Sequence, residues 1–212
     1  MRDWAYTADM TASSRTLSDL VEQFHACLFT NDLTTFQQLV STPEGRAALL
    51  DKEYSLLSSS ISRQNMDFIN AVIPLVDDEE MGWGASIAAM DGYPDILEHL
   101  LTVCPHAEDF LEDMVLVQTY SRAKWRAEEG VTDRAQHFER CFDVLVARLS
   151  SSVLDRHADF LHNEAHNYTT ARFYFDDTIE RVRQELAQRL RNGLANALNL
   201  LPPPQSKKER KL

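Results

Sequence analysis

Glycine and proline are scarce in this sequence. It contains 6 Gly and 7 Pro among 212 residues, and three of the prolines are adjacent, at positions 202–204. Because these residue types mark turns, their scarcity argues against a fold of many short strands and favours long helices. Hydrophobic residues make up 44% of the chain and charged residues 25%, which is the composition of a folded domain and not of a disordered chain.

Cysteine and long apolar runs are also scarce. The three cysteines, Cys27, Cys104 and Cys141, are far apart, and they form neither a CxxC motif nor a Cys/His zinc pattern. We therefore expect buried, reduced thiols of a cytoplasmic protein, with no cofactor. The first residues lack the apolar core of a signal peptide, and no apolar run approaches the length of a membrane span, so we expect no membrane partner.

Positive charge is deficient over most of the chain. The formal net charge is −12, which disfavours nucleic acid and anionic membranes as partners. The exception is the end of the chain, where Lys207, Lys208, Arg210 and Lys211 stand against Glu209. This tail fits a short basic nuclear-localisation pattern, and it fits equally a solvated, unstructured end. The expected location is therefore the cytoplasm, with the nucleus as the alternative.

Apolar residues recur at helical spacing in paired units separated by short polar turns. In three successive units, one residue occupies the same place in the turn, and one residue occupies the same buried place in the second helix. The turn residues are Asn31, Gln64 and Gly92, and the buried residues are Phe36, Ile69 and Leu97. The units are offset by 33 and then 28 residues, and a period of 33 is that of ankyrin repeats.

The third unit, residues 82–103, carries a family resemblance. Its segment from Trp83 to Ala89 stands where ankyrin repeats have T-P-L-H-x-A-A, and Gly92-Tyr93 replaces the G-H pair. Asp95-Ile96-Leu97 and Leu100-Leu101 match the second helix of the repeat. The chain thus resembles the ankyrin repeat family. The resemblance implies an all-α stack of three to four antiparallel helix pairs that binds a partner on its concave face.

The remaining sequence completes a division into four parts. We expect a flexible N-terminal segment over 1–15 and an ankyrin-like repeat domain over 16–149. In the repeat domain, Thr16 is expected to cap the first helix, and the fourth helix pair is expected to be longer than the others. Residues 150–201 are expected to form a C-terminal helical cap or extension. Within them, 150–178 form an irregular connection with some helix, and Asp177 or Thr178 caps a last amphipathic helix. Residues 202–212 form a disordered basic tail.

Six residues are the candidate partner-binding site. The run from Leu75 to Glu80 is expected to be an acidic loop, and ankyrin proteins carry a projecting finger at this place. The resemblance implies that Asp78, Glu79, Glu80 and Trp83 lie on or near this finger, and that Met90 and Asp91 lie on the exposed side of the inner helix. The acidic run is equally consistent with a solubilising loop, and Trp83 with packing against the next repeat.

The sequence therefore predicts a monomeric, non-catalytic interaction module for a basic or mixed protein partner. The sequence contains no G-x-S-x-G motif and no glycine-rich phosphate loop. The alternative is a helical metal-binding protein or hydrolase that uses the His/Asp cluster at 155–166. In that cluster His162 and His166 are four residues apart, and His157 and Asp159 lie close by. A third interpretation makes 150–201 a self-associating or docking helix pair.

Overall fold

The computed structural model describes residues 4–49, 55–165 and 174–199, with side chains from residue 17 to residue 196 within these ranges. Every regular element in these ranges is a helix, so the expected all-α fold is confirmed. The α-helices are α1 Trp4–Thr30, α2 Leu33–Val40, α3 Pro43–Leu49, α4 Leu56–Ser62, α5 Met66–Val72, α6 Asp78–Asp91, α7 Pro94–Val103, α8 Val115–Glu128, α9 Thr132–Arg148, α10 Ser151–Glu164 and α11 Phe175–Asn199. Two 3₁₀ helices are η1 Ile73–Leu75 and η2 Pro105–Phe110.

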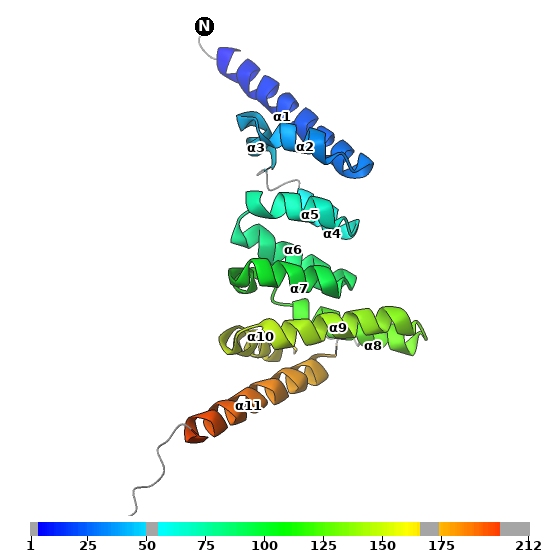
Figure 1. Cartoon of the computed structure of the whole chain (residues 1–212), viewed down its shortest axis with the longest axis vertical. Coiled ribbons are helices and arrows are strands. Elements are labelled where there is room, and N and C mark those ends of the chain that lie inside the picture. Colours follow the sequence, from blue (N-terminus) through cyan, green and yellow to red (C-terminus); the bar gives the residue numbers. More distant parts are fainter. Residues whose placement is uncertain (1–3, 50–54, 166–173, 200–212) are drawn as a thin grey trace, which may run out of the picture.

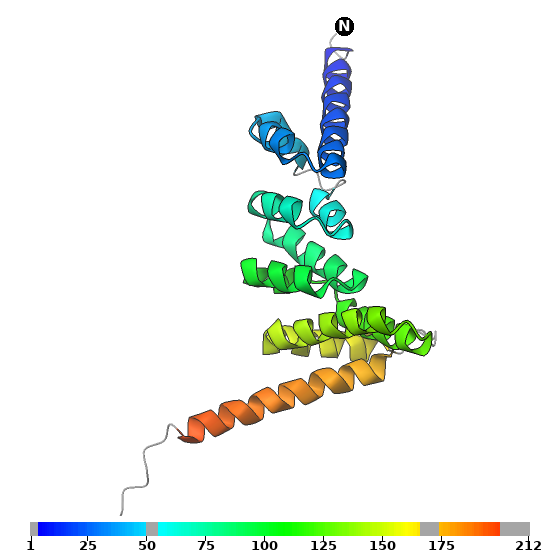
Figure 2. The same cartoon turned by 45° about the vertical axis from the view of Figure 1, so that its right-hand side comes forward.

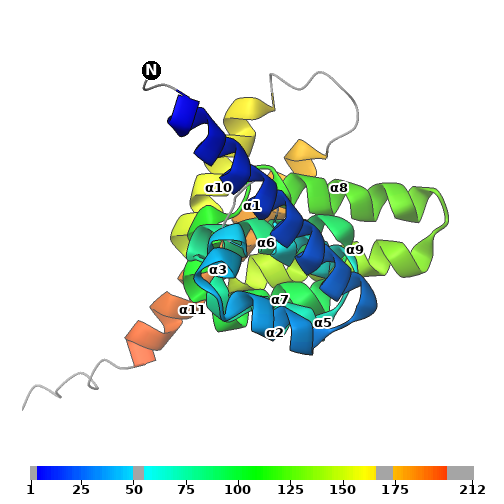
Figure 3. The ribbon, with the colours of Figure 1, turned by 90° about the horizontal axis from the view of Figure 1, so that it is seen from above.

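The helices form pairs that follow one another along a single axis in sequence order (Figure 1). The pairs are α1/α2, α4/α5, α6/α7 and α8/α9, and α10 and α11 lie at the C-terminal end of the stack. Seen along this axis, α6 and α7 lie below α1 and α2 (Figure 3). One continuous core of buried side chains extends from α1 to α11.

The turn within each pair has the same backbone structure. Asn31, Gln64, Gly92 and Gly130 have φ angles of 57°, 54°, 78° and 76°. In each turn the following residue donates its N–H to the carbonyl five residues earlier, at 2.8, 3.0, 2.9 and 2.8 Å in chain order. This is the Schellman ending of a helix, which needs one residue in the left-handed region. The equivalence predicted for Asn31, Gln64 and Gly92 is confirmed, and Gly130 adds a fourth turn.

Side chains in the first two turns start the second helix of each pair. The Asp32 carboxylate accepts a hydrogen bond from the Thr35 N–H at 3.0 Å, and the Asn65 side chain accepts one from the Phe68 N–H at 3.2 Å. Both bonds satisfy N–H groups that a helix leaves without an internal partner. Asn65 also donates from Nδ2 to the Asn31 side chain at 2.9 Å, which links the first two turns.

Replacing Gln64 with glycine is expected to raise the free energy of unfolding by about 0.5–1 kcal/mol. Glutamine is strained at a positive φ, and glycine relieves this strain. The free energy gained in this way exceeds the cost of the greater conformational entropy that glycine gives the unfolded chain. Urea denaturation measures the change. The matched reverse substitution is Gly92→Ala, which should destabilise, because its φ is 78° and a Cβ there would lie 3.0 Å from the Phe138 ring. A stabilising Gly92→Ala would refute this description of the turns.

The second helices are anchored by large buried side chains at the predicted positions. Phe36, Ile69 and Leu97 are all fully buried, as the repeat alignment predicts. Phe36 also lies between two other aromatic rings, with centroids 5.7 Å from Phe24 and 5.2 Å from Phe68. The first two helix pairs are therefore joined by a row of three phenylalanines.

Three sequence-based boundaries are wrong. Helix α1 begins at Trp4, so Thr16 lies inside it and not at its start. Residues 151–164 form the regular helix α10, because Ser150 caps its start and Val153, Leu154, Ala158 and Leu161 bury one face. Helix α11 begins at Phe175, before the expected caps, and the Thr178 hydroxyl donates to the Tyr174 carbonyl inside it. The predicted tail at 202–212 lies outside the described residues.

Candidate functional site

Helix α6 lies at the centre of the stack, and half of its 14 residues are buried. Its buried residues are mostly small, and they are Met81, Gly82, Gly84, Ala85, Ser86, Ala88 and Ala89. Two glycines allow neighbours to approach it closely. A Cβ on Gly82 would lie 2.7 Å from the Ala107 carbonyl oxygen of η2, and a Cβ on Gly84 would lie 2.9 Å from the Leu57 side chain of α4. The helix is therefore enclosed by η2 and α4, with Trp83 between the two contacts.

Apart from the exposed Asp78, the accessible side chains of α6 lie on one side of the helix. They are Glu79, Glu80, Trp83, Ile87, Met90 and Asp91, which we call the α6 stripe. The spacing of four, four and three residues from Glu79 to Met90 places them on one side of the helix. Trp83 is 49% exposed, which is unusual for so large an apolar side chain. Five of the six predicted site residues are thus brought together.

Asp78, the sixth predicted residue, points elsewhere. Its Oδ1 accepts a hydrogen bond from the Cys104 thiol at 3.0 Å. Burial, and then this hydrogen bond, raises the pKa of Cys104 above its usual value. Asp78 therefore joins the start of α6 to the end of α7 and is not part of the α6 stripe.

The expected acidic loop and finger are also wrong. Asp78, Glu79 and Glu80 form the first turn of α6, and Asp77 caps that turn by accepting from the Glu80 N–H at 2.9 Å. Carboxylates are favoured in this position because the helix N-terminus carries partial positive charge. The acidic run is thus a helix start and not a projecting loop.

Two carboxylates of the α6 stripe contact the neighbouring pairs. The Ser55 hydroxyl, at the start of α4, donates to the Glu80 carboxylate. Asp91 lies 3.8 Å from Arg122 of α8, and the Arg122 guanidinium lies 6.0 Å from the centroid of the Phe138 ring. These contacts link the two ends of the stripe to α4 and α8. The apolar side chains in its middle therefore lie between two ordered contacts.

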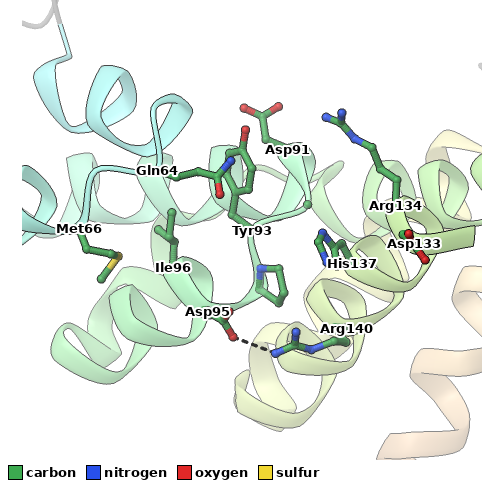
Figure 4. A pocket seen from close by; sticks show the side chains of 12 residues that line it. Gln64, Met66, Asp91, Tyr93, Asp95, Ile96, Asp133, Arg134, His137 and Arg140 are labelled. Carbon is green, nitrogen blue, oxygen red and sulfur yellow. Dashed lines mark hydrogen bonds and ion pairs between the residues drawn. The ribbon is translucent and has the colours of Figure 1, made fainter. Parts of the chain in front are cut away.

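A cleft of about 480 Å³ opens where the stripe ends, at the edge formed by the turns. We call it the turn-edge cleft, and Figure 4 shows the side chains that line it. They come from the second turn, the third turn and the start of α7, and the first turns of α9. Asp91 belongs to both surfaces, so the cleft continues the α6 stripe.

The cleft carries charges of both signs. Arg140 and Asp95 form an ion pair at 2.8 Å across its lower rim, and both side chains are largely exposed, so this pair contributes little to stability. Asp133, Arg134 and His137 line the α9 side (Figure 4). Sequence reasoning missed this cleft, because its walls come from segments up to 76 residues apart, from Gln64 to Arg140, and only the stacking brings them together.

The alternative His/Asp site is dispersed. His157 is fully buried on α10, where its Nδ1 lies 3.2 Å from the Asp113 carbonyl oxygen, whereas Asp159 and His162 are exposed. His166 lies outside the described residues. No group of three or more His, Cys, Asp or Glu within the described ranges is arranged to hold a metal ion.

The buried His157 is expected to make stability depend on pH. Burial lowers its pKa below the usual 6.5, with Arg156 adding to the effect while the hydrogen bond to Asp113 and the Asp113 charge oppose it. Below about pH 6.5 the unfolded chain therefore takes up a proton that the folded chain does not. The stabilisation is present above pH 6.5 and is lost on acidification, at up to about 1.4 kcal/mol per pH unit.

Urea denaturation between pH 7.5 and 5.5 measures this effect. His157→Leu should flatten the pH dependence, and it also removes an Nε2 atom that has no hydrogen-bond partner. His162→Leu is the matched control, because it removes a histidine from the exposed side of the same helix. Equal pH profiles for wild type and His157→Leu would show that this histidine is not the group that titrates.

Among the described helices, none is both long and apolar enough to cross a bilayer. No protein-family model, curated protein or solved structure matches the chain.

Proposed function

We propose that this protein is a non-catalytic scaffold of divergent ankyrin-like repeats that binds a partner protein through the α6 stripe and the turn-edge cleft. The observation that carries the proposal is the α6 stripe itself. A central helix with one face buried in the stack leaves a line of side chains accessible on its other side, including a half-exposed tryptophan. Exposed tryptophan in a rigid, central position is typical of the energetic centre of a protein interface.

Several features support the ankyrin-like assignment. Four pairs share one Schellman turn, the resemblance of residues 82–103 falls on α6 and α7, and small residues let α6 lie close to its neighbours. One feature departs from the family. The connections before α6 and α8 are the 3₁₀ helices η1 and η2, where ankyrin proteins carry projecting loops. The proposed binding surface therefore rests on the inner helix and the turns, and not on fingers.

The energetics of this surface favour recognition over chemistry. Because the stripe is held by a packed stack, binding orders few additional groups and loses little conformational entropy. The net charge of −12 favours a basic or mixed partner, whose association slows as ionic strength rises. An association rate that does not change with salt would contradict this electrostatic part of the proposal.

The cysteines and the basic tail support an intracellular site of action. Cys27, Cys104 and Cys141 are all free thiols, and burial raises the pKa of Cys141 to about 12, so this thiol is unreactive at neutral pH. We accordingly place the partner in the cytoplasm, with the nucleus as the alternative that the basic tail provides.

Affinity capture from a lysate of the cells that produce the protein tests the proposal. The variant Trp83→Ser/Met90→Gln changes the apolar part of the stripe at one exposed and one partly buried position and leaves the fully buried side chains in place, and circular dichroism verifies its fold. The control, Val103→Ser, alters a side chain of similar exposure at the end of α7. A partner that wild type and control capture and the stripe variant does not would support the proposal. A partner captured equally by all three would contradict it.

A further inference from the structure

The charge of this chain is distributed unevenly along the sequence, with a basic C-terminal segment after a long acidic part. Residues 183–212 contain seven basic and two acidic side chains, a net charge of +5, and the 182 residues before them carry −17. The basic residues are Arg183, Arg189, Arg191, Lys207, Lys208, Arg210 and Lys211, and the acidic ones are Glu185 and Glu209. The basic C-terminal segment of one copy is therefore attracted to the acidic part of another copy.

The basic end begins on a helix that leaves the stack. The first half of α11 packs on α10 and α8 through the buried side chains of Phe175, Ile179 and Val182. Arg189 lies at the end of this packing. Its guanidinium donates to the Leu149 carbonyl, just beyond the end of α9, at 2.7 Å, and to the Ala147 carbonyl, within the last turn of α9, at 3.2 Å. Past this point α11 runs away from the stack (Figures 1 and 2).

The part of α11 beyond Arg189 comprises residues 190–199, and its side chains are described as far as residue 196, where they leave two leucines exposed. We call this part distal α11. Leu190 and Leu194 are 65% and 57% exposed, and they lie four residues apart on the same side of the helix. Every side chain described from residue 191 to residue 196 is exposed, and a Cβ on Gly193 would meet no atom within 4 Å. The amphipathic face that docks α11 on the stack thus continues into open solvent.

The α6 stripe is the complement of distal α11 in both polarity and charge. Its apolar side chains, Trp83, Ile87 and Met90, are preceded by the acidic first turn of α6. The stripe is about 18 Å long and distal α11 about 15 Å, at 1.5 Å per residue. An antiparallel arrangement would bring the basic sequence after α11 to the acidic start of α6, with the two helix dipoles opposed.

We propose that distal α11 and the basic sequence after it bind the α6 stripe of a second copy of this chain, antiparallel to α6. This inference rests on the proposed function, because it names a partner for the same surface. The contact joins two different surfaces, so each copy offers one of each and the assembly grows head to tail. Leu190 and Leu194 pack on Met90 and Trp83, and the basic residues pair with the acidic first turn.

Sedimentation velocity on the full chain tests this contact. The stripe variant is Trp83→Ser/Met90→Gln, and the distal variant is Leu190→Asp/Leu194→Asp. All four positions are exposed or part-buried, and circular dichroism verifies the fold of each variant. Wild type is expected to self-associate at micromolar concentration at low salt, and less so as salt rises. Either variant alone is expected to raise the dissociation constant at least about tenfold.

The decisive sample is an equimolar mixture of the two variants. Each mixed pair retains one intact stripe and one intact distal α11, so the mixture is expected to form dimers and nothing larger. Val103→Asp, an exposed change on neither surface, should assemble as wild type does. A monomeric wild type, a monomeric mixture, or a stripe variant that still self-associates would each overturn the inference, the last by showing that distal α11 pairs with itself.

The two proposals fail separately. If the wild-type chain stays monomeric while the stripe variant loses a captured partner, the α6 stripe remains a binding surface and only the second copy is wrong as its occupant. If assembly follows the pattern above, the stripe is a binding surface whether or not any other protein binds it.

Discussion

Replacing Phe36 with alanine is expected to lower the free energy of unfolding by about 3–5 kcal/mol. The side chain is fully buried, and its ring contacts those of Phe24 and Phe68, which belong to the first and second helix pairs. Removing it leaves a cavity at the boundary between these pairs, and in a stack each pair is stabilised mainly by its immediate neighbours. The loss should therefore be greatest in the N-terminal helices.

Phe29→Ala is the matched control, because it removes the same atoms from a ring that is 72% exposed near the end of α1. That ring contacts only the Arg63 guanidinium among the interactions described, at 4.7 Å, so its loss should cost less than about 1 kcal/mol. Urea denaturation followed by circular dichroism gives the totals, and hydrogen exchange gives their location. Similar losses for the two variants would contradict the packing described for Phe36.

The second large effect is expected from Gly82→Ala, which should destabilise by about 1–3 kcal/mol. Alanine normally stabilises a helix by about 1 kcal/mol relative to glycine. At this position the added Cβ would lie 2.6 Å from the Phe110 Cβ and 2.7 Å from the Ala107 carbonyl oxygen. Because these are backbone or near-backbone atoms of η2, they cannot move aside as the end of a flexible side chain can. The clash should therefore outweigh the gain in helix propensity.

Gly193→Ala provides the opposite case within the same chain. Gly193 also lies inside a helix, but a Cβ there would meet nothing within 4 Å. This substitution should raise the helicity of α11, by up to about 1 kcal/mol in local stability. Circular dichroism and urea denaturation of both variants give the comparison. If Gly82→Ala were as stable as wild type or more stable, the close contact between α6 and η2 would be wrong.

The repeat organisation could be predicted from the sequence because its signals are local. A turn residue and a buried residue recur at matching places in each pair, and both depend on the periodicity of one helix and its ending. Gln64 shows the strength of this evidence. Glutamine has no special tendency toward positive φ, yet the alignment of the repeats predicts that Gln64 occupies the turn position, where its φ is 54°. Such alignments require no knowledge of which helices touch.

The errors arose where a local signal was given another meaning. Asp77 begins a capped helix, but the charge of the run suggested a loop. His157 stands at a buried position of the apolar series in α10, but its residue type suggested chemistry and obscured the helix. The turn-edge cleft and the exposure of distal α11 carry no local signal, because both depend on where the stack places its elements.

The most direct test of the α6 stripe as a binding surface is a photo-crosslinking scan of the full-length protein in the cells that produce it. A photoreactive side chain would replace Trp83, Ile87 or Met90 in turn, and Val103 or Thr102 on α7 as controls. We predict crosslinks to one defined partner, another copy included, from the three stripe positions and not from the two controls. Equal crosslinking from both sets, or crosslinks from the controls alone, would contradict the assignment of this surface.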